Sequence, residues 1–528
     1  MPIRHSHAGR YCDVPGLELD VTITFAGNVP KGTEPVSVKT VGQLLDTAAD
    51  RWPDALGLIV PDGRQWTFAE LRATAVRVAR ALLTIAEPNE HVAVWSPNCA
   101  EWVLLQLGAG LAGLTVVTVN PACRSAEVAD VLARSRSVVV FHAAEFRGTD
   151  LADVLASVRG ELPALRTAVQ LRDWEAFLDR AVDRQLPAVA PDAAAQIQFT
   201  SGTTGRPKGA LLPHSAVVEN GIRGAQRWQV KPGEVWLNAM PMFHVAGSVI
   251  NALGALAAGA AQLICPFDPP VTAKLIREHD VSVACLGGTM WTMLLEQHEA
   301  ELSSIRVAIA GGQAISPDLV RRVDAVISGR MSILFGMTEL CGTITAASID
   351  DDEETRAETC GLPLPGVELR IVEGEIQVRG WLTMTGYFED PVSTAATLLE
   401  SGWLRTGDIG CLDERGRLRI TGRVKEMIIR GAENIYPAEI EIRLRAHPAI
   451  ADAAVFGLPD PVYGESVAAA LVLRSGVDAP SDAELRAWCR AELAPFKTPK
   501  TWRIVDALPM TPSGKIQKFR LRETFAEQ

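Results

Sequence analysis

The sequence predicts an α/β protein in which two doubly wound α/β halves are followed by a small β-barrel-like region and then by a compact α+β unit. Three observations support this class. Helical and strand-like patterns alternate in two separate stretches of the chain, and each stretch contains a near-continuous apolar segment of the kind found in buried parallel strands. From about residue 361, short β segments separated by glycines replace this alternation.

The first half begins with a helix expected over about 68–85, because Thr67 and Glu70 have the spacing of a capping box and apolar residues follow at helical intervals. The pattern continues with a strand at 91–95, a helix at 99–112, a strand at 115–119, a helix at 125–135 and a strand at 138–141. This alternation is typical of α/β units.

The second half repeats the alternation. It reads as a strand at 262–265, a helix at 271–279, strands at 281–286 and 307–310, a helix at 317–327 and a strand at 332–335. Ser316 is the expected N-cap of the helix at 317–327, and Pro317 fits its first turn. Beyond about residue 426, helices near 438–446 and 482–493 alternate with strands near 452–456 and 467–473, which predicts the α+β unit.

Two long uncharged stretches, Trp102 to Val119 and Val245 to Ile264, have borderline lengths for membrane spans. Each contains glycines and polar residues, and each reads better as a buried helix that runs into a buried parallel strand. We therefore expect no transmembrane segment.

Composition narrows the function classes. The net charge of -12 and the pI near 5.4 argue against a nucleic-acid-binding surface. The 9 cysteines include no Cys-x-x-Cys pair, and the 9 histidines lack ligand spacing, so neither a disulfide framework nor a zinc cluster is expected. The first residues lack an apolar signal core, and the cytoplasm is the expected location.

Residues 199–210 have the chemistry of a loop that surrounds a polyphosphate, and a strand-like segment at 196–199 precedes them. Thr200, Ser201, Thr203 and Thr204 supply hydroxyl donors, and Lys208 supplies a point charge. The glycines at 202, 205 and 209 allow the backbone N–H groups to approach an anion closely. This is not a Walker loop, because Pro207 stands where that motif has its second glycine. The alternative is a flexible surface turn, which the preceding strand disfavours.

Two further polar clusters follow predicted strands, at the sheet edge where α/β proteins bind ligands. Gly311, Gly312 and Gln313 come after one strand and offer close backbone approach. The segment Phe335-Gly336-Met337-Thr338-Glu339 follows a second predicted strand. The Phe335 ring could stack on a base, and the Glu339 carboxylate could bind Mg²⁺. Alternatively, Phe335 is a core residue and Glu339 a solvated charge.

Over roughly residues 40–520 the chain resembles the acyl-adenylate-forming family of acyl-CoA synthetases, which is related to adenylation domains and firefly-type luciferases. Eight segments match in family order: Phe199 to Gly209, Pro241 to His244, Phe335 to Glu339, Gly374 to Tyr387, Trp403 to Asp408, Gly422 to Lys425, Gly431 to Ile435 and Pro509 to Ile516. The resemblance implies an N-terminal AMP-binding domain over 1–424 and a small, mobile C-terminal domain over 425–528.

The resemblance also implies residue roles. Asp408 would accept hydrogen bonds from the ribose hydroxyls of ATP with help from Arg423, and Thr338 would contact the α-phosphate. Glu339 would bind magnesium. The expected nucleotide- and cofactor-binding set is Thr200, Ser201, Gly202, Thr203, Thr204, Gly205, Lys208, Gly311, Gly312, Gln313, Phe335, Gly336, Asp408, Arg423 and Gly431. The expected catalytic set is Lys515, Thr338, Glu339 and His244.

Lys515 is the strongest catalytic candidate, because attack of a carboxylate on the α-phosphorus develops negative charge that an ammonium stabilises. It lies on the C-terminal domain and the ATP residues on the N-terminal one, which implies closure about a hinge at Lys425. In the resembled family that domain then rotates and brings the Gly431 segment to a thiol tunnel for CoA. His244 either orients the thioester step or is a hydrogen-bonded core histidine.

The chain departs from the family pattern at three places: Phe335 replaces a common Tyr, Glu426 replaces a common Asp, and Arg430-Gly431-Ala432 replaces a common Ser-Gly-Gly. The alternative functions are loading of a separate carrier protein, luciferase-like oxygenation and inactive AMP binding.

A fatty or aryl acid is the preferred substrate, because Met290, Trp291 and Met337 predict an apolar pocket between segments near 245–251, 288–293 and 337–343. Oligomeric state, monomer or homodimer, is left open.

Overall fold

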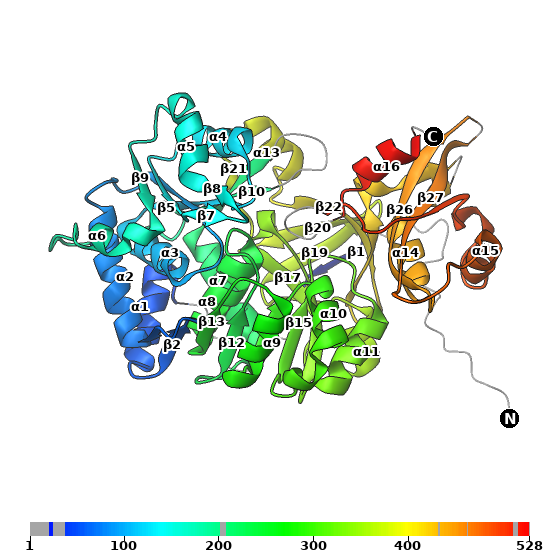
Figure 1. Ribbon diagram of the computed structural model, residues 1–528, viewed down its shortest axis with the longest axis horizontal. Coiled ribbons are helices and arrows are strands. Elements are labelled where there is room, and N and C mark those ends of the chain that lie inside the picture. The colour runs from blue at the N-terminus through cyan, green and yellow to red at the C-terminus, as the bar shows by residue number, and fades with distance from the viewer. Residues whose placement is uncertain are drawn as a thin grey trace.

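The computed structural model describes residues 21–24, 37–200, 207–430, 433–461, 463–510 and 516–526. Within these ranges two large mixed sheets lie side by side, a smaller antiparallel sheet lies near the centre, and the C-terminal unit stands at one end (Figure 1). The two large sheets correspond to the two doubly wound halves expected from the sequence.

The seven-stranded sheet has the order β21-β11-β10-β5-β4-β6-β9. Its parallel strands are β4 (His91–Trp95), β5 (Thr115–Val119), β6 (Val139–His142), β9 (Thr167–Gln170) and β10 (Ala194–Thr200), and the antiparallel edge is β11 (Lys208–Pro213) and β21 (Gly386–Tyr387). The associated helices are α1 (Val41–Arg51), α2 (Phe68–Leu82), α3 (Ala100–Ala112), α4 (Ser125–Arg134), α5 (Leu151–Val158) and α6 (Trp174–Leu178). The predicted capping box of Thr67 and Glu70 starts α2.

The nine-stranded sheet has the order β18-β17-β16-β15-β14-β12-β13-β2-β3. These strands are β2 (Leu56–Ile59), β3 (Gln65–Thr67), β12 (Val235–Asn238), β13 (Ala261–Ile264), β14 (Val283–Leu286), β15 (Val307–Ala310), β16 (Arg330–Met337), β17 (Gly342–Ala346) and β18 (Leu362–Pro363). The helices around it are α7 (His214–Arg227), α8 (Ala252–Ala258), α9 (Pro269–Glu278), α10 (Gly288–Gln297), α11 (Pro317–Val326) and α12 (Glu353–Glu358). Ser316 caps α11 and Pro317 begins it, as predicted.

The small sheet is antiparallel, with the order β1-β19-β20-β22-β23. Its strands are β1 (Val21–Thr24), β19 (Val367–Val372), β20 (Glu375–Gly380), β22 (Leu404–Leu412) and β23 (Leu418–Arg423), and α13 (Pro391–Thr397) lies between β21 and β22 in the chain. The predicted glycine-rich β region therefore includes one strand from the beginning of the chain, β1, which pairs with β19 at the edge of the sheet (Figure 1).

The C-terminal unit has its own sheet and its own buried clusters. Strands β24 (Ile428–Arg430), β25 (Glu433–Ile435), β26 (Ile450–Asp460), β27 (Gly464–Leu473) and β28 (Thr501–Ile504) combine with α14 (Pro437–Arg445), α15 (Asp482–Arg490) and α16 (Lys518–Ala526). This confirms the predicted α+β character, although β26 is longer than the strand expected at 452–456.

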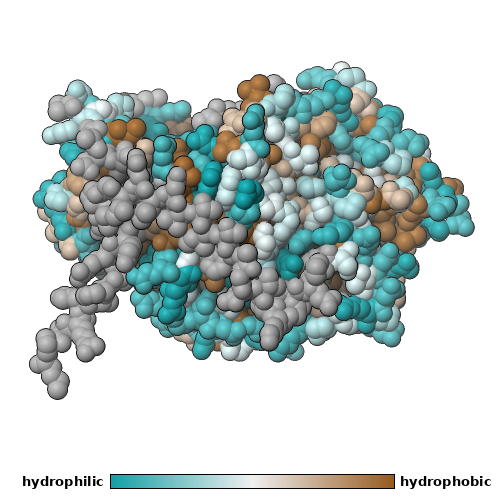
Figure 2. Space-filling model, turned by 180° about the vertical axis from the view of Figure 1, so that it is seen from behind, coloured by the Kyte–Doolittle hydropathy of each residue, from teal (hydrophilic) through white to brown (hydrophobic). Residues whose placement is uncertain are grey.

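The two long uncharged stretches are buried helix-to-strand units, as predicted. The first is α3, which ends at Gly113 in the left-handed conformation (φ 67°) and leads into the fully buried β5. The second is a π-helical segment followed by α8 and the buried β13. None of the helices among the described residues has the length and apolar character that crossing a bilayer requires. The visible surface in Figure 2 is mostly hydrophilic, with scattered apolar patches.

Candidate active site

Several of the predicted site residues lie at one edge of the nine-stranded sheet. Strands β12, β14, β15 and β16 run parallel, so their carboxyl ends meet at the same edge. His244 follows β12, Gly288 follows β14, Gly311 follows β15, and Phe335 to Glu339 span the end of β16 and the turn after it. The structure thus brings together segments that are about a hundred residues apart in sequence.

Close packing explains the glycines of this edge. A Cβ atom added to Gly311 would lie 2.7 Å from the backbone oxygen of Leu334, and one added to Gly336 would lie 2.2 Å from the backbone oxygen of Gly342. Gly312 has a left-handed backbone (φ 79°) with open space where a Cβ would stand. Packing against the neighbouring strand thus requires glycine at 311 and 336, whereas the space beside Gly312 is open to a ligand such as adenine.

Glu339 is a buried carboxylate with a defined partner. It is 9% exposed, and its Oε1 accepts a hydrogen bond of 2.9 Å from the hydroxyl of Tyr387 on β21. Burial, together with the nearby charge of Glu339, raises the pKa of Tyr387, so this phenol stays protonated and donates. Glu339 is thus not the solvated charge that the alternative interpretation proposed. Phe335 is 5% exposed and packs in the core, as the alternative for that residue suggested.

Two paired strands flank the predicted polyphosphate loop. Thr200 ends β10 and pairs with Lys208 at the start of β11, and the Thr200 hydroxyl donates to the backbone oxygen of Lys208 at 3.4 Å. The Lys208 ammonium lies 5.1 Å from the centroid of the Tyr387 ring. The predicted loop members Ser201, Gly202, Thr203, Thr204 and Gly205 lie outside the described residues.

Asp408 and Arg423, the predicted ribose-binding residues, face each other on neighbouring strands of the small sheet. They are register partners on β22 and β23, and the Arg423 Nε donates to the Asp408 Oδ1 at 2.7 Å. Burial lowers the pKa of Arg423, but the carboxylates of Asp408 and Glu426 outweigh burial and raise it. The charge of Glu339 also acts on Arg423, which places the pair near the end of β16.

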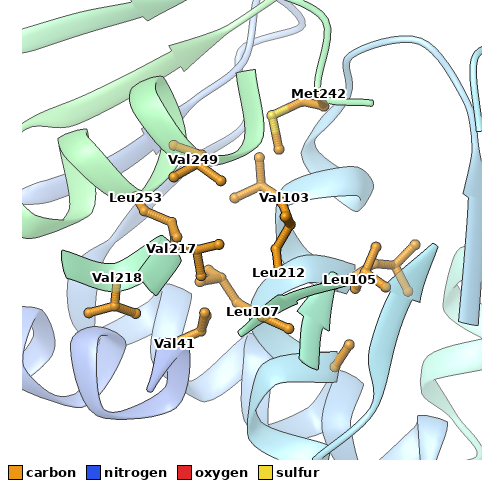
Figure 3. Packing of buried hydrophobic residues seen from close by; sticks show 14 of the residues in the cluster. Val41, Val103, Leu105, Leu107, Leu212, Val217, Val218, Met242, Val249 and Leu253 are labelled. Carbon is orange, nitrogen blue, oxygen red and sulfur yellow. The ribbon is translucent and has the colours of Figure 1, made fainter. Parts of the chain in front are cut away.

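His244 stands at the start of a π-helical segment, Ala246–Asn251. Its Nδ1 accepts from the backbone N–H of Ala246 at 3.3 Å, and its backbone oxygen accepts from Ser248. Single π-helical turns inside helices are frequent at functional sites. Figure 3 shows the buried side chains of Met242, which precedes this segment, and Val249, which lies within it, near Val103 of α3, so the segment rests on a packed core.

One predicted pocket residue is a core residue instead. Trp291 is completely buried, and its indole N–H donates to the backbone oxygen of Ile309 at 3.0 Å. The apolar periodicity of α10 could not distinguish its inner face from a pocket wall. Met290 and Met337 are only partly buried, and Gln313 is exposed, with its amide 3.4 Å from the Thr289 hydroxyl.

The structure describes only some of the residues predicted to act from the C-terminal part of the chain. Lys515 and Gly431 lie outside the described residues, and so does Ala432. Lys425, the predicted hinge, lies in a single 3-10 turn, Val424–Glu426, between β23 and β24.

Lys518 and Tyr387 have contacts that the sequence does not indicate. The Lys518 ammonium lies 2.7 Å from Glu426 and 2.7 Å from Glu441, which joins α16, the turn Val424–Glu426 and α14. Tyr387, whose contacts with Glu339 and Lys208 are described above, was noted only as part of a motif. A helix-starting lysine and a strand tyrosine carry no signal of such contacts, because their partners are distant in sequence.

The donor set fits Mg²⁺. No three His, Cys, Asp or Glu side chains of the described ranges converge into a metal cage. Mg²⁺ is commonly held by one or two carboxylates together with substrate phosphates, and a single buried carboxylate suits that arrangement. Glu339 is the residue that would hold the ion, whose charge would offset that of the phosphates.

Solved structures define the class of protein. ATP-bound MatB from Rhodopseudomonas palustris matches with a TM-score of 0.84 at 27% identity, over 92% of this chain and 99% of that chain. MenE from Bacillus subtilis, in complex with the acyl-adenylate OSB-AMP, matches with a TM-score of 0.79 at 28% identity, over 91% and 97% of the two chains. The fold is that of adenylate-forming enzymes.

The AMP-binding enzyme family model matches residues 45–388, and the model of its C-terminal domain matches residues 439–515. The chain belongs to the AMP-binding enzyme family. It is 37% identical to the 3-[(3aS,4S,7aS)-7a-methyl-1,5-dioxo-octahydro-1H-inden-4-yl]propanoyl:CoA ligase of Mycobacterium tuberculosis, over 92% of this chain and 99% of that protein. It is 32% identical to the mouse medium-chain acyl-CoA ligase ACSF2, mitochondrial, over 92% and 87% of the two chains. The chain is thus an acid–thiol ligase that forms acyl-CoA through acyl-AMP.

Proposed function

We propose that this ligase activates a carboxylic acid with an apolar body, fatty or aryl, at the carboxyl edge of the nine-stranded sheet. The main support is that three groups from different parts of the fold lie near one another. Tyr387 contacts both Glu339 and Lys208, and the charge of Glu339 acts on Arg423, the partner of Asp408. A carboxylate for a cation, an ammonium for phosphates and a carboxylate for ribose hydroxyls are the groups that ATP requires.

The roles follow from this placement. Asp408 and Arg423 hold the ribose, Lys208 contacts the β- and γ-phosphates, and Glu339 binds Mg²⁺. Gly311, Gly312 and Gly336 take the adenine beside Phe335, and Gln313 borders it. Thr338, which is 8% exposed beside Glu339, contacts the α-phosphate.

The remaining roles rest on the family resemblance. We assign residues 1–424 to the AMP-binding domain and 425–528 to a C-terminal domain that turns about Lys425. Ser201, Gly202, Thr203, Thr204 and Gly205 surround the departing pyrophosphate. Lys515 stabilises charge during adenylation, whereas Gly431 borders the path of CoA and His244 orients the second step. We place the enzyme in fatty acid metabolism and in the cytoplasm, and cell fractionation tests this location.

The acid is tested with purified enzyme, ATP, Mg²⁺ and CoA against octanoate, benzoate and a fused-ring propanoate. The last acid is included because of the ligase from Mycobacterium tuberculosis. We expect AMP release that depends on both CoA and an apolar acid. Release only with a separate carrier protein, or only with small dicarboxylic acids, would refute the proposal.

The two half-reactions test Lys515. Lys515→Ala is expected to abolish ATP–pyrophosphate exchange and largely to spare thioester formation from synthetic acyl-adenylate. Equal loss of both activities would contradict the assignment of Lys515 to adenylation alone.

A further inference from the structure

Tyr387 lies between two groups that the proposed function assigns to ATP. Its hydroxyl donates to Glu339 Oε1 at 2.9 Å, and its ring centroid lies 5.1 Å from the Lys208 ammonium. The residue itself is 8% exposed. One side chain therefore contacts the predicted ligand of the cation and the predicted partner of the phosphates.

The backbone around Tyr387 is held on several sides. Tyr387 pairs with Ala210 of β11, and the next residue, Phe388, donates its N–H to the Gly209 oxygen at 2.7 Å. The Tyr387 N–H itself donates to the Thr394 hydroxyl at 2.9 Å. These bonds fix β21 against the hairpin that carries the phosphate loop.

A further bond ties this strand to the other sheet. The Met384 N–H donates to the backbone oxygen of Glu339 at 2.9 Å, three residues before Tyr387. Glu339 is thus held through its backbone and its side chain by the same short segment, 384–387. This segment is the connection between the end of β16 and the edge of the seven-stranded sheet.

We propose that Tyr387 is a positioning residue of the adenylation step, which orients the Glu339 carboxylate toward the cation of ATP and supports Lys208 above its ring. This inference rests on the proposed function, because it takes Glu339 as the ligand of the cation. Tyr387 itself need not touch ATP.

The geometry gives each contact a separate consequence. With one carboxylate oxygen bound to the phenol, Glu339 presents the other oxygen singly, which suits the strict octahedral demand of Mg²⁺. Hydrogen-bonded partners of metal-binding carboxylates typically matter about 10- to 100-fold for metal affinity. The aromatic face attracts the Lys208 ammonium without neutralising its charge, so the ammonium keeps its attraction for phosphate.

Tyr387→Phe separates the two contacts, because it removes the hydroxyl and keeps the ring. The measurement is binding of Mn²⁺, as a spectroscopic substitute for Mg²⁺, to the enzyme–ATP complex without acid, so that no turnover occurs. We expect about 10-fold weaker Mn²⁺ binding or more, with ATP affinity in EDTA unchanged within about twofold. Tyr463→Phe, which removes the hydroxyl of an exposed tyrosine in the C-terminal unit, is the matched control and should bind Mn²⁺ like the wild type.

Glu339→Gln distinguishes the two ways of failing. If this variant binds Mn²⁺ as tightly as the wild type, Glu339 is not the ligand and that part of the proposed function falls. If it loses Mn²⁺ while Tyr387→Phe does not, the positioning role of Tyr387 alone is refuted. Thermal unfolding of each variant shows whether it is folded.

Tyr387→Leu tests the ring. Relative to Tyr387→Phe it should weaken ATP binding in EDTA about two- to fivefold, since it removes the support of Lys208. Equal ATP affinities of the two variants would refute the contribution of the ring.

Discussion

Replacement of Asp408 by Asn gives the sharpest test of the ribose assignment. Asp408 is 5% exposed and already receives a 2.7 Å hydrogen bond from Arg423. Asn has nearly the same shape and keeps one acceptor oxygen, but it lacks the charge. The substitution therefore changes what the carboxylate offers to a ligand while it disturbs the packing of β22 very little.

The magnitude follows from the number of bonds. A hydrogen bond to a charged group contributes about 1.5–3 kcal/mol, compared with about 1 kcal/mol for a neutral pair. If two ribose hydroxyls donate to the carboxylate, the substitution should therefore weaken the binding free energy by about 1–4 kcal/mol in total. At about 1.4 kcal/mol per tenfold, we expect AMP affinity to fall roughly 5- to 700-fold.

The assay is calorimetric titration with AMP, 2′-deoxy-AMP and 3′-deoxy-AMP, which removes each partner from the ligand side in turn. In the wild type, each deoxy ligand should bind markedly more weakly than AMP. In Asp408→Asn, this difference should shrink, because the bond that the hydroxyl would make is already weakened. The two substitutions together form a double-mutant cycle whose coupling energy reports the contact.

If Asp408→Asn discriminates AMP from both deoxy ligands as strongly as the wild type does, Asp408 does not contact the ribose. Asp413→Asn is the matched control. Asp413 follows the same strand and pairs with Arg417 at 2.6 Å, so this variant disturbs a similar ion pair outside the site. It should leave AMP affinity within about twofold of the wild type.

Three stability predictions follow from buried groups and backbone geometry. Burial lowers the pKa of His214 to about 4, so the unfolded chain binds more protons between pH 6.5 and 4, and about 3 kcal/mol of stability should be lost over that range. His214→Gln, followed by urea unfolding at both pH values, should lose correspondingly less, and an equal loss would contradict burial as the cause. Lys518→Met should cost about 3–5 kcal/mol, because two carboxylates lose their partner, whereas Lys274→Met, whose pair with Glu278 is exposed on both sides, should cost under about 1 kcal/mol; similar urea midpoints would refute the difference. Gly311→Ala should lower the melting temperature more than Gly312→Ala, which meets open space and should cost about 1–2 kcal/mol for its left-handed backbone; the reverse order would contradict the packing at Leu334.

Local patterns predicted most elements of the two large sheets. Strands at 91–95, 115–119 and 307–310 have the predicted bounds, because each is a short β-branched or apolar run between clear breaks. The helix at 68–85 ends three residues earlier than expected, at Leu82. Helix ends depend on tertiary contacts as well as on composition, so such boundaries are the least predictable part.

The pairing of distant strands could not be read from the sequence. β2 precedes the whole first half yet pairs with β13 in the nine-stranded sheet, and β1 joins β19 from more than three hundred residues away. The register of such pairs is decided by packing between sheets, which no local pattern records. The role of Tyr387 was missed for the same reason, since Glu339 is its partner only through the fold.

The groups proposed to hold ATP have protein partners before any nucleotide binds. Arg423 holds the Asp408 carboxylate, and Tyr387 holds Glu339 and lies beneath Lys208. Side chains that are already fixed lose less conformational entropy when a ligand arrives, and they are aligned for the reaction without further reorganisation. Because the bond between Tyr387 and Glu339 runs between the two large sheets, the accuracy of the site depends on how these sheets pack against one another. A small change at the 384–387 segment should therefore affect cation and phosphate binding together, although neither group is altered.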